Sequence, residues 1–206
     1  GVDLNEACGP SLHTAILAAL DAPGRRVEHI QKLVAAGADP LLPHATGDNT
    51  LSWAMGYHHP GTVTPASEQA LFTYLTTLGI DIENRSDGTW TTLHRAILQS
   101  TAGQAEVLLK AGADPSALLA PEYEPEFLAE ATSLMLAAPK PAVVRLLLAH
   151  GANARQTDGQ GRRMLDFVTE EAAAARDRAT EDDPWTIAHA DALDETLAIL
   201  QAHLAH

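Results

Sequence analysis

Apolar positions along this chain recur in two short phrases that alternate with polar turns. The first phrase starts with a small polar residue, continues with Leu and reaches a small Ala three residues later. The second is an apolar run that ends in Gly followed by Asp or Asn. The first occurs as PSLHTA (10–15), NTLSWA (49–54), TTLHRA (91–96), TSLMLA (132–137) and, degraded, RMLDFV (163–168). The second occurs as KLVAAGADP (32–40), YLTTLGIDI (74–82), VLLKAGADP (107–115) and LLLAHGANA (146–154).

Each repetition predicts a helix, a tight turn, a second helix and a loop. Ser11, Thr91 and Thr132 precede apolar runs, where a hydroxyl can accept a hydrogen bond from a free N–H of the first helical turn. Gly ends the second helix because it adopts positive φ without steric cost, and the Asp or Asn two residues later suits the next turn. These positions are Gly37, Gly79, Gly112 and Gly151, with Asp39, Asp81, Asp114 and Asn153.

The last part of the chain predicts two longer helices. Residues 163–179 form the first, TEDDPW at 180–185 is the break, and residues 186–206 form the closing helix. In the closing helix, apolar residues recur near helical spacing at Ile187, Leu193, Leu197, Leu200 and Leu204. Because a lone helix pair cannot bury both of its faces, the pairs must stack, and this last pair is expected to cap the stack. The opening ten residues are expected to cover the other end.

The two phrases resemble those of the ankyrin repeat, with T-P-L-H-x-A in the first helix and an apolar run to G-A-D in the second, over about 33 residues. The resemblance implies an all-α ankyrin-repeat solenoid of about five helix-turn-helix units, with capping helices and long inserted loops, in one domain over 1–206. The first two units carry insertions near 21–26 and 56–68. The units are expected at about 9–40, 47–82, 88–115, 131–154 and 160–206.

Composition and charge limit the classes of partner. Hydrophobic residues make up 46% of the chain and aromatic residues only 4%, so Ala and Leu supply a core that favours helices. The net charge of −14 disfavours nucleic acid and anionic membranes and favours a basic protein. The charge is uneven: residues 114–130 hold five acidic residues with no Lys or Arg, and residues 169–206 have a net charge of −7.

The expected compartment and chemistry follow from what the sequence lacks. No run of eighteen apolar residues occurs, so no membrane-spanning helix is expected. The first ten residues lack the basic start and apolar stretch of a signal peptide. A cytoplasmic location is therefore favoured, and a signal peptide removed before Gly1 is the alternative. Cys8 is the one cysteine, so no internal disulfide is expected. We expect a monomer that has no cofactor, no metal and no enzymatic activity, because no catalytic fingerprint appears.

The histidines and the acidic break are the residues that raise a metal hypothesis. His13 and His94 occupy the Leu-His pair, where the resemblance implies a structural hydrogen bond that ties adjacent turns. His58 and His59 are adjacent, and adjacent side chains diverge, so they are a weak metal signal. The 180–185 segment lacks the alternating ligands and central Gly of a calcium loop and is interpreted as a solvated break with an N-cap role.

By resemblance, the loop tips and the exposed parts of the first helices bind other proteins. The most unusual loop, 117–131, alternates three Glu with Tyr and Phe, and we interpret it as an electronegative finger for a basic pocket; a plain solvated loop is the alternative. Trp53 is expected in the core, whereas Trp90 lies in a loop, where it either contacts the partner or covers a neighbouring loop. The predicted partner-binding residues are Thr46, Asp48, Tyr57, His58, Arg85, Asp87, Trp90, Gln99, Glu122, Tyr123, Glu124, Glu126, Phe127, Gln160 and Arg162.

These patterns favour a non-catalytic module for protein–protein interaction. The specific hypothesis is an acidic inhibitor or immunity-type protein that neutralises a basic partner, such as a toxin or nuclease, by covering its functional cleft. One alternative is a scaffold or adaptor whose acidity serves only solubility. Another is a hydrolase that uses surface carboxylates.

Overall fold

The computed structural model describes residues 3–7, 9, 13–56, 65–86, 88–99, 102–121, 130–180 and 182–205. Helix accounts for 56% of the chain, which confirms the predicted all-α class. In the described ranges the strands amount to one two-stranded antiparallel pair, β1 (Arg85–Ser86) with β2 (Trp90–Thr91). Backbone contacts divide the chain into two compact units, Gly1–Ala113 and Asp114–His206.

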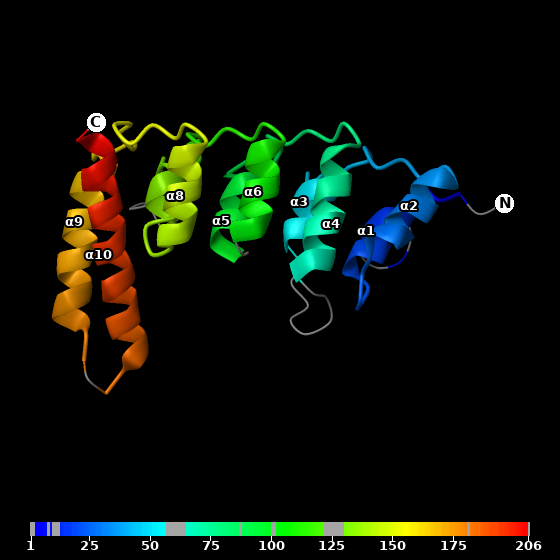
Figure 1. Cartoon of the computed structure of the whole chain (residues 1–206). Helices are drawn as coiled ribbons and strands as arrows, with labels where there is room; N and C mark the ends of the chain where they lie inside the picture. Colours follow the sequence, from blue (N-terminus) through cyan, green and yellow to red (C-terminus); the bar gives the residue numbers. More distant parts are fainter. Residues whose placement is uncertain are drawn as a thin grey trace. The chain divides into compact units, whose positions relative to one another are not determined.

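The first unit is built from three helix pairs in two layers (Figure 1). First helices contact first helices and second helices contact second helices, so each pair buries its apolar faces on its neighbours. Leu51, Leu93 and Leu108 are among the fully buried residues of this core. The pairs are α1 (Ala15–Asp21) with α2 (Val27–Ala35), α3 (Thr50–Gly56) with α4 (Pro65–Thr76), and α5 (Thr92–Gln99) with α6 (Ala102–Lys110).

The second unit repeats this arrangement with two pairs. A short α7 (Ser133–Leu136) and α8 (Pro141–Ala149) form one pair, and the long α9 (Met164–Arg178) and α10 (Pro184–Leu204) form the other. Helix α7 contacts α9, and α8 contacts α10. The α9–α10 hairpin extends well past the end of α8 (Figure 1). The two long helices and the break between them lie where the apolar pattern predicted them.

The helix starts follow the predicted capping chemistry in the later repetitions. The Thr91 hydroxyl accepts a hydrogen bond from His94 N–H at 3.2 Å, and the Thr132 hydroxyl accepts one from Met135 N–H at 3.2 Å. In the first repetition the expected place is wrong: α1 begins at Ala15, and its N-cap is Thr14 rather than Ser11. Thr14 also stands before an apolar run, so the helix starts three residues later than the alignment placed it. Ser11 itself lies outside the described residues.

The helix ends follow the prediction at all four glycines. Gly37, Gly79, Gly112 and Gly151 have φ between 75° and 102°. At the third, Ala113 N–H donates to Leu108 O at 3.0 Å, the long closing bond of a Schellman motif. The turn residues Asp39, Asp81, Asp114 and Asn153 then each accept a hydrogen bond from the N–H two residues later, at 2.8–3.0 Å.

Candidate protein-binding surface

Three surface turns share one construction, and we call them the tip turns. Each is closed by a hydrogen bond from the N–H of a glycine to the carbonyl oxygen three residues before it, and each glycine has positive φ. The turn geometry therefore requires Gly at this place. The tip turns are 44–48, closed by Gly47 and His44 at 2.9 Å; 85–89, closed by Gly88 and Arg85 at 3.3 Å; and 158–162, closed by Gly161 and Asp158 at 3.0 Å.

The 44–48 turn is fixed by its own side chains. His44 Nδ1 accepts a hydrogen bond from Thr46 N–H at 3.2 Å, and the Thr46 hydroxyl donates to Asp48 Oδ2 at 2.8 Å. The other oxygen of Asp48 lies 3.2 Å from the Arg95 guanidinium of α5. Asp48 is only 6% exposed, so its carboxylate is bonded inside the chain, whereas Thr46 is exposed. We therefore assign Asp48 the role of holding the turn on α5 and leave Thr46 as the outward residue.

The 158–162 turn has the same internal brace with different residues. Asp158 Oδ1 accepts hydrogen bonds from Gln160 N–H and Arg162 N–H, both at 2.9 Å. The Arg162 guanidinium returns to Asp158 Oδ2 at 2.8 Å and lies over the Phe167 ring, 5.3 Å from its centroid. Gln160 is exposed, and Arg162 is half-buried. Asp158 here and His44 in the first turn hold equivalent positions, and both accept from the N–H two residues later.

The 85–89 turn closes the β1–β2 pair. Arg85 is exposed, and its Nη1 donates to Thr89 O at 3.0 Å across the turn. Trp90 pairs with Ser86 in the ladder and is half-buried. A half-buried indole can cover the hairpin and also offer an edge to a partner.

A cluster of three rings joins the 44–48 turn to α3: it consists of His13, just before α1, His44 of the turn and Trp53 of α3. Trp53 is 5% exposed, as predicted for a core residue, and its indole N–H donates to Asp21 Oδ1 at 2.8 Å. His13 Nδ1 lies 3.1 Å from Asp21 Oδ2, and its ring meets the Trp53 ring edge-on at 5.0 Å. His44 also packs on Trp53, with ring centroids 4.4 Å apart. His13 thus packs beside the turn through its ring, and its polar partner is Asp21 of α1 rather than a neighbouring turn.

The acidic finger is described only at its two ends. Glu130 has φ 53°, a left-handed conformation that is unusual for a residue with a side chain. Its side chain lies against the backbone of Gly159: a Cβ at Gly159 would lie 2.8 Å from Glu130 Cβ and would overlap the Glu130 carboxyl group. The base of the finger is thereby seated on the 158–162 turn.

Seven of the fifteen predicted site residues are described, and they fall into three groups by exposure. Thr46, Arg85, Gln99 and Gln160 are exposed, Trp90 and Arg162 are half-buried, and Asp48 is buried. Thr46 and Asp48 are brought into contact, and Arg162 lies beside Gln160 in one turn. Sequence reasoning missed His44, Asp21 and Arg95, although the spacing of His44 from Gly47 matches that of Asp158 from Gly161. Tyr57, His58, Asp87, Glu122, Tyr123, Glu124, Glu126 and Phe127 lie outside the described residues.

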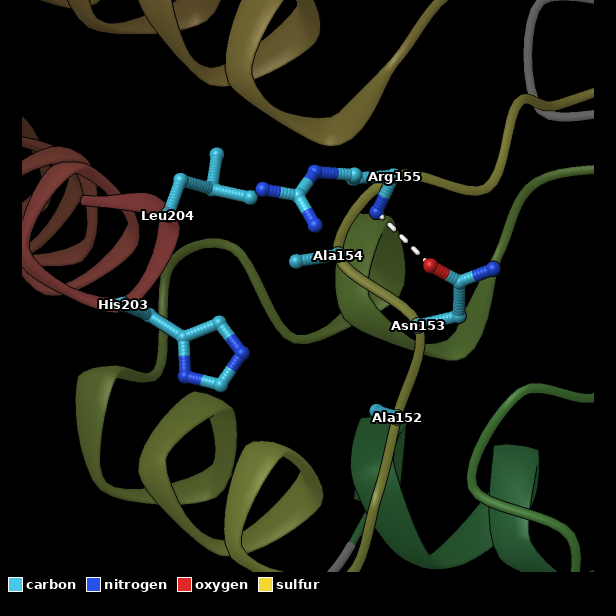
Figure 2. Close-up of a pocket in the computed structure, with 6 residues that line it drawn as sticks. All are labelled: Ala152, Asn153, Ala154, Arg155, His203 and Leu204. Carbon is cyan, nitrogen blue, oxygen red and sulfur yellow. Dashed lines mark hydrogen bonds between the residues drawn. The ribbon is translucent and has the colours of Figure 1, made fainter. Parts of the chain in front are cut away.

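A shallow pocket of about 370 Å³ lies in the second unit, between the turn after α8 and the end of α10 (Figure 2). Arg155 and His203 supply its polar groups, and Asn153 Oδ1 accepts a hydrogen bond from Arg155 N–H at 3.0 Å. The six residues that line it include no carboxylate. The residues that line it are Ala152, Asn153, Ala154, Arg155, His203 and Leu204.

Within the described ranges, no group of three or more His, Cys, Asp or Glu residues is placed to hold a metal ion. In the same part of the chain, no helix has both the length and the apolar character needed to cross a membrane. Comparison of the chain with protein-family models and with curated proteins gives no match.

Proposed function

We propose that this protein is a non-catalytic, ankyrin-type module that binds a basic protein partner through its tip turns and the adjoining first helices. The observation that carries the proposal is the shared construction of the three tip turns. Each is closed by a positive-φ glycine and braced by its own side chains, while Thr46, Arg85 and Gln160 stay exposed. A loop that is already ordered loses little conformational entropy on binding, so such turns suit recognition.

The ankyrin-type assignment is supported by the order of parts in each repetition. A Thr or Asn cap starts the first helix at Thr14, Asn49, Thr91 and Thr132. A positive-φ glycine then ends the second helix, and an Asp or Asn turn follows. Within each unit, stacked pairs of this kind hold the loops at their ends, which suits loops that bind a partner.

The chemistry of the partner is inferred from charge. The net charge is −14, and the acidic residues concentrate in 114–130 and 169–206. Fixed charge of one sign accelerates encounter with a partner of the opposite sign and repels competitors of like charge. We therefore propose an inhibitory role, in which the finger seated on the 158–162 turn covers a cleft that its partner uses for anions.

Reversal of charge on the finger tests this proposal. Glu124→Lys with Glu126→Lys should slow association with a partner captured from the source cell and reduce the salt dependence of the association rate. The matched control is Glu28→Lys with Asp191→Lys, two exposed carboxylates on α2 and α10 with the same change in net charge. Equal association rates for the two double variants would contradict the finger's role. A wild-type rate that does not depend on salt would favour the scaffold alternative.

A further inference from the structure

Trp185 is an exposed aromatic residue that neither the core nor the tip turns use. It lies in the first turn of α10 and is 70% exposed, the highest value among the exposed large hydrophobic residues described. His189, one turn later on the same face, stacks on the indole with ring centroids 5.2 Å apart and an interplanar angle of 9°. One face of the indole is thus covered by an imidazole, and most of the rest of the ring is open to solvent.

The first turn of α10 is joined to the segment after α9 by one hydrogen bond, from Thr180 N–H to the Thr186 hydroxyl at 3.2 Å. The side-chain bonds from α10 to the α7–α8 pair occur further along the helix, where Thr196 donates to Ala138 O at 2.8 Å and Glu195 pairs with Arg145 at 3.0 Å. The ion pair with α9, between Asp194 and Arg176, also lies beyond Trp185. The tip of the α9–α10 hairpin extends past α8 (Figure 1). Packing in this unit therefore does not account for a large aromatic residue at this place.

The surroundings of Trp185 are acidic. Asp182 and Asp183, three and two residues before it, are exposed, and no Lys or Arg occurs from residue 179 to the end of the sequence. Asp183 Oδ1 accepts a hydrogen bond from Trp185 N–H at 3.0 Å, and Pro184 has no N–H to offer. The start of α10 is thus already capped by the Asp183 carboxylate, so an anion is not expected to bind there. The carboxylate also places negative charge beside the open face of the indole.

We propose that Trp185, His189, Asp182 and Asp183 form a second docking site, which takes an arginine side chain of a partner protein. A guanidinium can stack on the open face of the indole and donate its N–H groups to the neighbouring carboxylates. Indole is the best of the aromatic faces for such a cation, and an exposed Trp is a typical anchor at protein interfaces. This proposal does not rest on the role proposed for the tip turns.

A peptide titration tests the site directly. The probe is the blocked peptide Gly-Arg-Gly-Arg-Gly, and the readout is the indole N–H signal of Trp185 in a two-dimensional NMR spectrum, assigned by its loss in Trp185→Leu. The arginine peptide should shift this signal to saturation, and the same peptide with neutral citrulline in place of arginine should not. The Trp185→Leu variant has no such indole signal, so binding of the arginine peptide is followed at the backbone amide of His189. Its affinity for the peptide should be about two- to fivefold weaker than that of the unsubstituted protein.

Matched charge variants separate docking from general attraction to an acidic protein. The double variant Asp182→Asn with Asp183→Asn keeps the helix cap, because Asn caps a helix as well as Asp does. It should bind the arginine peptide about two- to fivefold more weakly. Glu170→Gln with Asp191→Asn makes the same charge change elsewhere and should leave the affinity unchanged. Equal affinities for the two double variants would overturn the proposal. A shift with the citrulline peptide, or a response of Trp185 to phosphatidylcholine vesicles but not to the arginine peptide, would also overturn it.

Discussion

The guanidinium of Arg25 donates to both carboxylate oxygens of Glu68, from Nε at 3.0 Å and from Nη2 at 2.8 Å. Nη1 donates to Ala54 O at 3.0 Å, and Gln104 Nε2 donates to Glu68 Oε2 at 3.2 Å. Arg25 is 3% exposed and Glu68 6%. This buried cluster joins residues of all three helix pairs of the first unit, and its two charged members come from the insertions that interrupt the repeats.

Removal of one member of this pair should strongly destabilise the first unit. Arg25→Met or Glu68→Leu leaves an uncompensated buried charge, and each should lower the free energy of unfolding by about 3–5 kcal/mol. The double variant removes both charges, so its loss of unfolding free energy should be smaller than the sum of the losses in the two single variants. Urea denaturation gives the free energy of unfolding of the unsubstituted protein, the two single variants and the double variant. Additive effects, or a loss below about 1 kcal/mol in either single variant, would contradict a buried and coupled pair.

Thr91 and His94 cap the start of α5 reciprocally. The Thr91 hydroxyl accepts from His94 N–H, and His94 Nδ1 accepts from Thr91 N–H, each at 3.2 Å. His94 is fully buried, so His94→Ala leaves a buried N–H without its acceptor and should cost about 1–3 kcal/mol. His94→Gln keeps an acceptor at the position that a capping box uses and should recover part of this loss. Equal stabilities of the Ala and Gln variants, measured by denaturation, would show that the hydrogen bond is unimportant.

Glu130 and Gly159 should show coupled effects. A Cβ at Gly159 would overlap the Glu130 side chain, so Gly159→Ala should destabilise the second unit by about 1–3 kcal/mol. Glu130→Gly removes that side chain and suits the positive φ at this position, so it should restore most of the loss in the double variant. A double-mutant cycle by thermal denaturation measures the coupling. Independent effects would mean that the finger's base does not sit on the 158–162 turn.

Lys140, between α7 and α8, should respond to alkaline pH. Burial lowers the pKa of its ammonium group below the ordinary value of 10.5. Between the lowered pKa and 10.5, the unfolded chain binds more protons at this site than the folded chain, so the contribution of Lys140 to stability rises with pH in that window. The stability of the natural chain relative to Lys140→Met should therefore increase toward pH 10.5. A relative stability that falls or stays constant over that range would contradict the burial of the charge.

The sequence predicted those features that local chemistry determines. Thr132, Gly112 and Asp114 each act within a few residues of their own position, and the structure uses them as helix cap, helix end and turn. The two long closing helices could be predicted for the same reason, because the helical spacing of apolar residues is a local pattern that does not depend on residues far away in the chain. The start of α1 was misplaced because Ser11 and Thr14 both suit an N-cap.

The features that sequence reasoning missed depend on residues far apart in the chain. Arg25 pairs with Glu68, 43 positions away, and Asp48 pairs with Arg95. No local pattern distinguishes a carboxylate that will be buried by such a pair from one that faces solvent. Trp185 was missed for another reason, since the acidic break around it has a sufficient explanation in the cap that Asp183 provides.

Hydrogen exchange of the chain with and without its captured partner tests the central claim most directly. The account predicts that amides of the tip turns 44–48, 85–89 and 158–162, with those of the 117–131 finger, become protected in the complex. Amides on the outer faces of the second helices α2, α4 and α6 should exchange at unchanged rates. Protection confined to those second helices, with none at the tip turns, would contradict a protein that binds through its turns.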